Sequence, residues 1–478
     1  MTGCKSDKGS AAMTTSRRDF LLGSGAAGLG CGCARRPRVE PGAKVVIVGA
    51  GFAGIGAARA LRKAGYATEI VEARDRIGGR AWTKETTPAP VDLGASWLHS
   101  GAKNALAGLA RESGLAFNIS DYNNVDVFGL SGSMVEKKPI TQVYEELDIA
   151  DRFKSQLFWP YLRWRLGGGA SGRSIGDVWE EAVAGEVDAL SGEAYRMILE
   201  TQYAVPLHEE AMESLFLGGE QLPNHEWFMT GGMQTFADYL AKDLQVRLST
   251  HVREIEWSRG AARIVTNNGE IEAAAVVLTV SAGLLKRQAI RLTPGLPADA
   301  RAALDRLGMG LLNKIALSYP SVSWPVDSEY FVLAGGELPA IIANHPVYSG
   351  APVLLGLTGG ATSRRLETMS DEEAAARLHR DFERALGLKL PEPDGAAVTR
   401  WASDPLAGGS YSHRKPGARL DEGDILARPV DDTLFLAGEA IVSDDDAGNV
   451  SGAYRSGQRA AAQIAGLSAP KKRNAILV

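Results

Sequence analysis

The sequence predicts an α/β fold, and three successive patterns within residues 44–72 support this prediction. Residues 44–48 form a short apolar run that is rich in β-branched side chains and bounded by glycine, which is typical of a buried strand. An alanine-rich amphipathic segment, expected to be a helix, continues to Ala64. After Gly65 a second short strand ends at Glu72. Strand, helix and strand in this order indicate an α/β domain.

The turn between the first strand and the helix reads GAGFAG, so that its glycines have the G-x-G-x-x-G spacing. The first glycine permits a tight turn, the second lets the backbone approach a pyrophosphate, and the third lets helix and strand pack closely. The helix N-terminus presents free N–H groups to phosphates, and Glu72 is placed to bind a ribose hydroxyl. The pattern therefore predicts dinucleotide binding, whereas a glycine turn made only for packing is the alternative. The residues expected to contact the dinucleotide are Gly49, Gly51, Phe52, Ala53, Gly54 and Glu72.

The next residues narrow the choice of nucleotide. Residues 72–80, EARDRIGGR, resemble the E-A-x-x-R-x-G-G-R signature of flavin amine oxidases. The resemblance implies FAD rather than NAD, with Arg80 near the pyrophosphate and the flavin. It also adds Ala73, Arg74 and Gly79 to the expected cofactor site.

Residues 91–99, VDLGASWLH, resemble the D-L-G-A-S-W-L-H-G stretch of polyamine oxidases, with Ser100 in place of the final glycine. The resemblance implies that Gly94 and Ala95 are small because the backbone runs against the isoalloxazine ring, and it places Ser96 and Trp97 at the cofactor too. L-amino-acid oxidases have a carboxylate-binding arginine at the Trp97 position, so a free α-amino acid is a poor candidate substrate. His99 is expected to face the substrate amine, the alternative being a structural histidine.

Lys314 begins an otherwise apolar strand, where a buried ammonium is costly without a partner. Residues 310–315, GLLNKI, resemble the family's G-x-x-N-K-I stretch, in which the lysine holds a water near flavin N5. Lys314 is therefore the expected catalytic residue. Further strands are predicted at 314–319, 330–333, 340–343 and 353–357, forming the sheet that floors the substrate cavity, followed by a helix capped by Ser370 and Glu373.

The C-terminal part repeats the resemblance. Residues 401–412 resemble the W-x-x-D-P-x-x-x-G-S-Y-S run of polyamine oxidases and flavin histone demethylases, which implies that Trp401 packs at the flavin edge and Tyr411 walls the amine site. Monoamine oxidases place a second tyrosine at the position of Asn449, so this amine site is expected to be only half aromatic. The remaining cofactor contacts implied by the family are Val252, Gly438, Glu439, Asn449 and Val450.

Two acidic clusters are ambiguous in the sequence. Glu209, Glu210 and Glu213 either line an entrance for a polycation or form a solvated helix face, and the second interpretation is favoured. Residues 444–446 are three adjacent aspartates that either recruit a second ammonium or cap the surface.

The resemblance implies an FAD-binding, Rossmann-like domain of the glutathione-reductase type, built from residues 40–102, 231–289 and 396–468. An α+β substrate-binding domain would comprise residues 103–230, expected to be a helical cap, and residues 290–395. Residues 469–478 are expected to be a tail.

The N-terminus resembles a twin-arginine export signal. Arg17 and Arg18 lie in the run SRRDFLL, which precedes a Gly/Ala-rich stretch. Residues 1–39 are therefore expected to direct export, by the twin-arginine machinery, to the periplasm or beyond, with Met1 or Met13 as the start. A disordered basic tail and lipidation at Cys31 are the alternatives. All three cysteines precede residue 40, so the mature chain would have no disulfide, no cysteine metal site and no cysteinyl-flavin bond.

Composition limits the possible partners. The hydrophobic fraction of 45% and the charged fraction of 23% are those of a globular protein, and no apolar run reaches the ~18 residues that cross a bilayer. The net charge of −5 argues against nucleic acid and is compatible with cationic substrates. No metal site is expected.

Taken together, the resemblance implies an FAD-dependent amine oxidase. The amine would transfer a hydride from its α-carbon to flavin N5, the imine would hydrolyse, and dioxygen would give hydrogen peroxide. The alternatives are an amine dehydrogenase that reduces a quinone or cytochrome, an L-amino-acid oxidase or desaturase-like enzyme, and an FAD-loaded binding protein without turnover.

Overall fold

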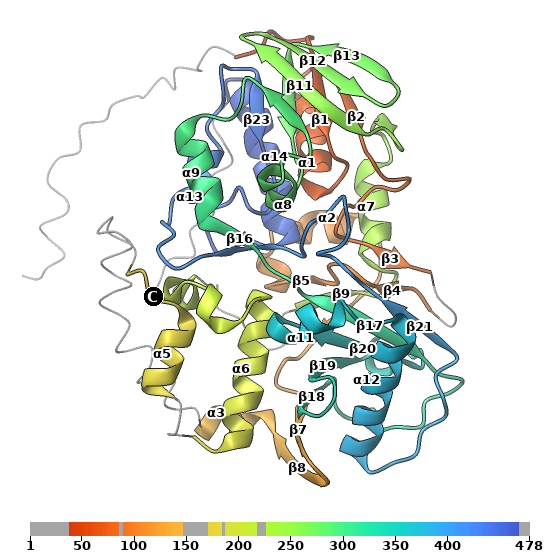
Figure 1. Ribbon diagram of the computed structural model, residues 1–478. Coiled ribbons are helices and arrows are strands. Elements are labelled where there is room, and N and C mark those ends of the chain that lie inside the picture. The colour runs from red at the N-terminus through yellow and green to blue at the C-terminus, as the bar shows by residue number, and fades with distance from the viewer. Residues whose placement is uncertain (1–37, 86–88, 147–170, 184–186, 218–225, 468–478) are drawn as a thin grey trace, which may run out of the picture. The chain divides into compact units, whose positions relative to one another are not determined.

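The computed structural model describes residues 38–85, 89–146, 171–183, 187–217 and 226–467 (Figure 1). The expected export signal, apart from its last two residues, and the expected C-terminal tail lie outside these ranges. Within the described residues, no helix is long and apolar enough to cross a membrane, and no group of three or more His, Cys, Asp or Glu side chains is arranged to hold a metal ion.

A five-stranded parallel sheet carries the dinucleotide motif. Its order is β10-β2-β1-β14-β23, from β1 (Lys44–Val48), β2 (Ala67–Val71), β10 (Val246–Arg247), β14 (Ala275–Leu278) and β23 (Leu434–Leu436). Alternate residues of β1 face opposite layers, because side chains along a strand alternate between its two faces. Val45 and Ile47 pack against the helices α1 (Phe52–Lys63) and α14 (Val450–Ile464). Val46 and Val48 pack on the other side.

A second sheet covers that other face. It has the order β13-β12-β11-β15, from β11 (Val252–Ser258), β12 (Ala261–Thr266), β13 (Gly269–Ala273) and β15 (Arg291–Thr293). Ile255, Trp257 and Ile264 pack from it onto β1 and β14, together with α9 (Ala298–Arg306). Helices, the parallel sheet and this mixed sheet, in which β15 pairs with β11 in parallel, thus form three layers.

A seven-stranded sheet forms the second large sheet of the fold, with the order β21-β17-β20-β19-β18-β7-β8. Its strands are β7 (Val125–Ser131), β8 (Met134–Pro139), β17 (Asn313–Ser318), β18 (Tyr330–Gly335), β19 (Ala340–Asn344), β20 (Val353–Thr358) and β21 (Gly395–Val398). Helix α12 (Asp371–Leu386) packs on one face through Leu378 and Phe382. Ser370 caps this helix by accepting the Glu373 N–H at 3.1 Å, which confirms the first half of the predicted cap. The Glu373 carboxylate pairs with Arg377 instead of returning to Ser370.

The described part of residues 103–230 contains both helices and strands. Helices α3 (Ile140–Glu146), α5 (Ile175–Ala182) and α6 (Ala189–Tyr203) do form, and they pack against Val127 and Val332 of the sheet. The same segment also contains β6 (Phe117–Ser120), β7, β8 and β9 (Glu226–Met229). The expectation of a purely helical cap is therefore wrong, because β7 and β8 extend the seven-stranded sheet through parallel pairing of β7 with β18.

The remaining elements are short. They are β3 (Thr83–Lys84), β4 (Val91–Asp92), β5 (Trp97–Leu98), α2 (Ala107–Glu112), α7 (Met233–Ala241), α8 (Ala282–Lys286), β16 (Leu307–Met309), α10 (His345–Ser349), α11 (Gly360–Leu366), β22 (Ser412–Arg414) and α13 (Glu422–Leu426), with 3-10 turns at Gly101–Lys103, Leu207–Glu209 and Met212–Phe216. Strand β9 pairs with both β5 and β6. Ser281 caps α8 by accepting the Leu284 N–H.

Candidate active site

One large cavity of about 2570 Å³ collects nearly all of the predicted site residues. It begins at the glycine-rich turn after β1 and continues to residues of β17, β18, β19 and β20 of the seven-stranded sheet. Its lining includes Gly49, Gly51, Phe52, Ala53, Glu72, Ala73, Arg74, Gly79, Arg80, Gly94, Ala95, Ser96, Trp97, His99, Val252, Lys314, Trp401, Tyr411, Gly438, Glu439, Asn449 and Val450. Gly54 does not line it.

The glycine-rich turn is shaped as the motif requires. Gly49 has φ +106°, a conformation that side chains rarely adopt. A Cβ on Gly54 would lie 2.0 Å from the Gly49 carbonyl oxygen and 3.2 Å from Ile47, so this glycine allows the helix to pack on the strand. A Cβ on Gly51 would have no neighbour closer than 4.0 Å, which leaves its backbone open to the cavity. These three environments fit a bound pyrophosphate.

Glu72 is fixed beside this turn. Its carboxylate accepts the backbone N–H of Ala50 at 2.7 Å and that of Arg74 at 2.8 Å. A carboxylate has about four acceptor positions, so two remain for a ribose. Both flanking helices begin at the cavity, α1 after Gly51 and α14 after Asn449. Their N-termini therefore direct partial positive charge toward it.

Arg80 and Glu439 form an ion pair at the cavity wall. Arg80 Nη1 lies 2.7 Å from Glu439 Oε1 and donates to the Ser410 carbonyl at 3.0 Å. The other Glu439 oxygen accepts the Ser412 N–H at 3.2 Å. Arg80 and Glu439 thus fix each other's side chains, and both bind the backbone of residues 410–412.

Gly94 has a reason to be glycine within the chain itself, in addition to the expected approach of the flavin ring. A Cβ there would lie 1.9 Å from the Arg80 carbonyl oxygen and 2.7 Å from the Trp82 nitrogen. Contact between two segments of this chain therefore excludes a side chain already, before any ring is bound.

Lys314 is buried, with an exposed fraction of 2%. Its Nζ donates to the Asp92 carbonyl at 3.0 Å, to the Gly94 carbonyl at 2.6 Å and to Ser96 Oγ at 2.6 Å. An ammonium has three donors, so a water held by this group would replace one of these acceptors. Burial lowers the pKa of Lys314 to about 8, and the Asp92 carboxylate opposes the shift.

Asp92 lies within the VDLGASWLH motif, and the sequence predicted no role for it. Its Oδ1 accepts the Met233 N–H at 2.9 Å, and burial raises the pKa of this carboxyl to about 6. Its Oδ2 is buried without a hydrogen-bond partner among the described residues. The charge of Asp92 acts on Lys314.

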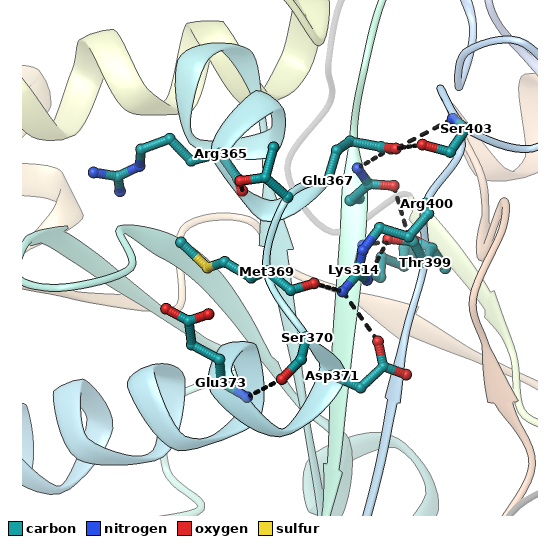
Figure 2. Close-up of polar contacts among 12 residues, drawn as sticks. Lys314, Arg365, Glu367, Met369, Ser370, Asp371, Glu373, Thr399, Arg400 and Ser403 are labelled. Atoms are coloured by element: carbon teal, nitrogen blue, oxygen red, sulfur yellow. Dashed lines mark hydrogen bonds and ion pairs between the residues drawn. The ribbon is translucent and has the colours of Figure 1, made fainter.

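Asn313 organises the loop that carries Trp401. The buried Asn313 Oδ1 accepts from Trp401 N and from Thr399 Oγ1, both at 3.0 Å, and its Nδ2 donates to Glu367 at 2.9 Å. Figure 2 shows Glu367 reaching Ser403, and Arg400 joining Met369 to Asp371. Sequence reasoning missed this role, although the asparagine is part of the GLLNKI motif.

The aromatic side chains at the predicted amine site are held in place by contacts with neighbouring residues. Trp401 is 4% exposed and meets Trp82 edge-on, with ring centroids 6.2 Å apart. Tyr411 donates to the backbone carbonyls of Thr201 and Gln202 at 2.9 and 3.0 Å. Burial raises its pKa, so the phenol stays neutral. Asn449 also lines the cavity and supplies no ring.

The first acidic cluster differs from expectation. Glu210 and Glu213 are 2% and 0% exposed, so the favoured interpretation of a solvated helix face is wrong for them. Glu210 Oε2 lies 3.0 Å from His413 Nδ1, whereas Glu209 pairs with Arg364. In the second cluster, Asp444 and Asp446 both pair with Arg455.

Glu226 is one of the cavity residues for which the sequence predicted no role. It is 2% exposed and pairs with His99 at 2.8 Å. The available signal was an acid at the head of the apolar run 226–229, EWFM, the same signal that singled out Lys314. Tyr122 and Tyr330, also not predicted, line the cavity nearby.

Comparison with known families agrees with this geometry. Residues 52–465 match the family described as flavin containing amine oxidoreductase. Because the match spans most of the chain, this protein belongs to that family and is an amine oxidoreductase that uses a flavin.

Individual relatives have related activities in their names. The chain is 32% identical to polyamine oxidase 2 of Arabidopsis thaliana, over 87% of each chain. It is 30% identical to lysine-specific histone demethylase 1 homolog 2 of Arabidopsis thaliana, over 93% of this chain but only 62% of that one. Two solved structures share the fold: putrescine oxidase bound to putrescine (TM-score 0.75, 24% identity, 88% of this chain and 98% of that one) and cyclohexylamine oxidase from Brevibacterium oxydans (TM-score 0.73, 23% identity, 89% and 99%).

Proposed function

We propose that this protein is an FAD-dependent amine oxidase that acts on a primary or secondary amine and uses dioxygen as electron acceptor. The observation that carries the proposal is the continuity of the cavity. Gly51 and Glu72 of the dinucleotide motif and Lys314, Trp401 and Tyr411 of the amine site line the same space. When bound, the flavin accepts a hydride at N5 and returns the electron pair to dioxygen, which becomes hydrogen peroxide.

The residues of the chain hold and orient the reactants. The backbone at Gly51, the Glu72 carboxylate and the helix N-termini at Phe52 and Val450 suit the phosphates and ribose of FAD. Tyr411 and Trp401 provide rings against which an amine lies, and an aromatic face stabilises a nearby cation by about 0.5–2 kcal/mol. With all three cysteines before residue 40, we propose that FAD is held without a cysteinyl bond.

Lys314 places a buried positive charge within this cavity. Its three acceptors fix the position of the ammonium, and because its pKa is about 8 it carries a proton at neutral pH. We assign it the role of holding a water, in exchange for one of these acceptors, where flavin N5 would lie. The amine must arrive neutral, since a protonated nitrogen has no lone pair to assist hydride departure.

The test is anaerobic bleaching of the purified yellow protein by a panel of amines and L-amino acids, followed by readmission of air. An oxidase is reduced by an amine and is rapidly restored by air, with one peroxide formed for each turnover. Slow restoration would favour the alternative, a dehydrogenase that passes electrons to a quinone or cytochrome. Reduction by L-amino acids alone would contradict the argument from Trp97, and no reduction at all would contradict the proposed function.

We also propose export by the twin-arginine route, on the strength of the motif around Arg17 and Arg18 alone. Replacing both residues by lysine should retain the flavoprotein in the cytoplasm, because the export receptor reads the arginine pair. Cell fractionation with flavin fluorescence as the readout would check this. Unchanged export of the double variant would contradict it.

A further inference from the structure

A line of hydrogen-bonded side chains, called here the hydroxyl line, begins at the cavity wall and ends at a carboxylate. It consists of Tyr330, Ser120 and Glu329. Tyr330 begins β18, and its hydroxyl oxygen lies 2.6 Å from Ser120 Oγ. Ser120 ends β6, is buried, and donates to Glu329 Oε2 at 3.2 Å. Of the three residues, Tyr330 lines the cavity and the other two do not, so the line connects the cavity with a group outside it.

The hydrogen atoms along this line all point away from the cavity. Each hydroxyl group has a single hydrogen to donate, and an ionised carboxylate only accepts. Ser120 and Tyr348 both donate to Glu329 Oε2, at 3.2 and 3.1 Å. Because the Ser120 hydrogen is used in this way, the hydrogen between Tyr330 and Ser120 belongs to Tyr330. The Tyr330 oxygen therefore keeps an acceptor position, and each link can pass a hydrogen toward Glu329.

Glu329 is fixed by one of its oxygens and open to water at the other. Its Oε2 accepts the Asp121 N–H at 2.8 Å in addition to the two hydroxyl groups. Its Oε1 has no hydrogen-bond partner among the described residues and is not one of their buried unpaired atoms. The side chain as a whole is only half-buried. A proton that reaches Glu329 therefore has a path to solvent.

The inner end of the hydroxyl line lies close to the expected reacting group. The Tyr330 and Trp97 ring centroids are 6.5 Å apart, and Lys314 Nζ lies 5.2 Å from the Trp97 ring. Tyr122, which also lines the cavity, packs edge-on against Tyr330 at 5.5 Å. Burial raises the pKa of both phenols. Tyr330 therefore gives up its hydrogen only when a donor in the cavity supplies another.

We propose that the hydroxyl line is a proton relay, which takes one proton from the ammonium group of the substrate before the amine reaches the flavin. An alkylammonium such as that of lysine has a pKa of about 10.4 in water, so a dissolved amine is charged at neutral pH. Hydride departure needs the nitrogen lone pair, so this proton has to leave the cavity. The inference rests on the proposed amine oxidase function and adds the route by which the proton leaves.

The proposed step balances in atoms and charge. One N–H bond of the ammonium group breaks, and its electron pair stays on the nitrogen as the lone pair. The proton binds to the Tyr330 oxygen, while the Tyr330 hydrogen moves to Ser120 and the Ser120 hydrogen moves to Glu329. Glu329 then releases a proton to water, and nothing is oxidised or reduced. Lys314 does not take this proton, because with a pKa of about 8 it already carries one at neutral pH.

The relay should matter only while the dissolved substrate is charged. At about pH 10 and above, much of the amine is neutral in solution, so no proton needs to leave the cavity with it. The wild type and the relay variants share all other titratable groups around the line, whose effects therefore cancel in a ratio of rate constants. These groups are His99, Asp121, Tyr122, Asp126 of β7, Glu226 of β9, Lys314 of β17, Asp327, and His345 and Tyr348 of α10.

The first experiment measures flavin reduction by stopped flow in the flavin-loaded wild type, Ser120→Ala, Glu329→Gln and Tyr348→Phe. The substrate is the amine of the bleaching panel that reduces the wild type fastest. At about pH 7, Ser120→Ala and Glu329→Gln should lower the second-order rate constant about 10- to 100-fold, because the positioned proton acceptors are lost. At about pH 10 the loss should shrink to less than about threefold.

Tyr348→Phe is the matched control. It removes a buried hydroxyl group from the same Glu329 oxygen but leaves the hydroxyl line intact, so its rate constants should stay within about threefold of the wild type at both pH values. Glu329→Gln, altered at a half-buried side chain, carries the test if Ser120→Ala does not fold. No loss at pH 7, or the same loss at both pH values, would overturn the relay, since a structural defect does not depend on the charge of the substrate.

A second readout does not depend on turnover. Analogues of the panel amines with a fully methylated α-carbon bind without giving a hydride, and a pH indicator in weakly buffered solution follows proton release at about pH 7. The wild type and Tyr348→Phe should release a proton as the analogue binds, and the two relay variants should do so about 10-fold more slowly or less. Binding without release, or release at the wild-type rate in both variants, would overturn the relay. If no panel amine reduces the flavin, the proposed function fails, while proton release still decides on the relay.

Discussion

Lys314 combines a buried charge with hydrogen bonds that leave it little freedom. Its ammonium has three acceptors on residues 92–96, and burial lowers its pKa to about 8. Lys314→Met should lower the rate constant of flavin reduction about 10- to 100-fold, since a fixed cationic donor is removed. Stopped-flow reduction by a saturating amine measures this. Lys389→Met, at a side chain that is 79% exposed, should leave the rate unchanged.

The same residue predicts a pH dependence of stability. A depressed lysine pKa contributes stability that is present above the unfolded value of 10.5 and is lost as pH falls through about 8. The Tm of Lys314→Met relative to that of the wild type should therefore rise as the pH is lowered from about 10.5 to about 8, and it should level off below pH 8. Thermal unfolding in a series of buffers measures the difference, and a flat difference would contradict burial of the charged group.

At the level of elements, the contact between α1 and α14 is set by a glycine. A Cβ on Gly457 would lie 1.9 Å from the Ala53 carbonyl oxygen and 2.8 Å from the Ala57 nitrogen. Gly457→Ala should therefore separate the two helices and destabilise the protein by about 1–3 kcal/mol, with weaker flavin retention. Gly108→Ala, on an exposed turn of α2 with open space around it, should instead add about 0.5–1 kcal/mol. Denaturant unfolding and gel filtration of the holoprotein would compare the two.

The elements also show what the sequence could reveal. Strands β17 to β20 were predicted within two residues, because each is a short apolar run between turn residues. β7 and β8 were missed, since β8 is almost entirely exposed and β7 owes its place to pairing with β18, far away in the chain. The pairing partner of a strand is not encoded locally.

At the candidate site, the sequence motifs predicted which residues line the cavity. They did not predict which residues these side chains contact. Apart from Gly54, the predicted residues line one cavity. The motif predicted that Gly94 lies at the cofactor site. Only the structure shows that the Arg80 carbonyl leaves no room for a side chain at this position. Glu210 and Glu226 form their histidine pairs across segments that are distant in sequence, and no spacing rule connects them.

On the scale of the whole molecule, a cavity of about 2570 Å³ makes stability depend on its occupant. Removal of the flavin should lower the Tm, and FAD at about 100 times its Kd should restore about 2.7 kcal/mol. FMN should stabilise less, because it lacks the adenosine half that would engage Glu72 and Val252. Differential scanning fluorimetry of the stripped protein compares the two nucleotides. Equal stabilisation by FMN would contradict the assignment of the Glu72 end.

The strand order of the parallel sheet has a consequence for biosynthesis. β1 is the first described strand in the chain, yet the sheet is completed by β23 and covered by α14, which come after residue 430. Most of the polypeptide is therefore synthesised before α14, the second helix at the phosphate-binding turn, can form. The nascent chain would then hold its prosthetic group only after synthesis is nearly complete, and a message truncated before Leu434 should yield colourless protein.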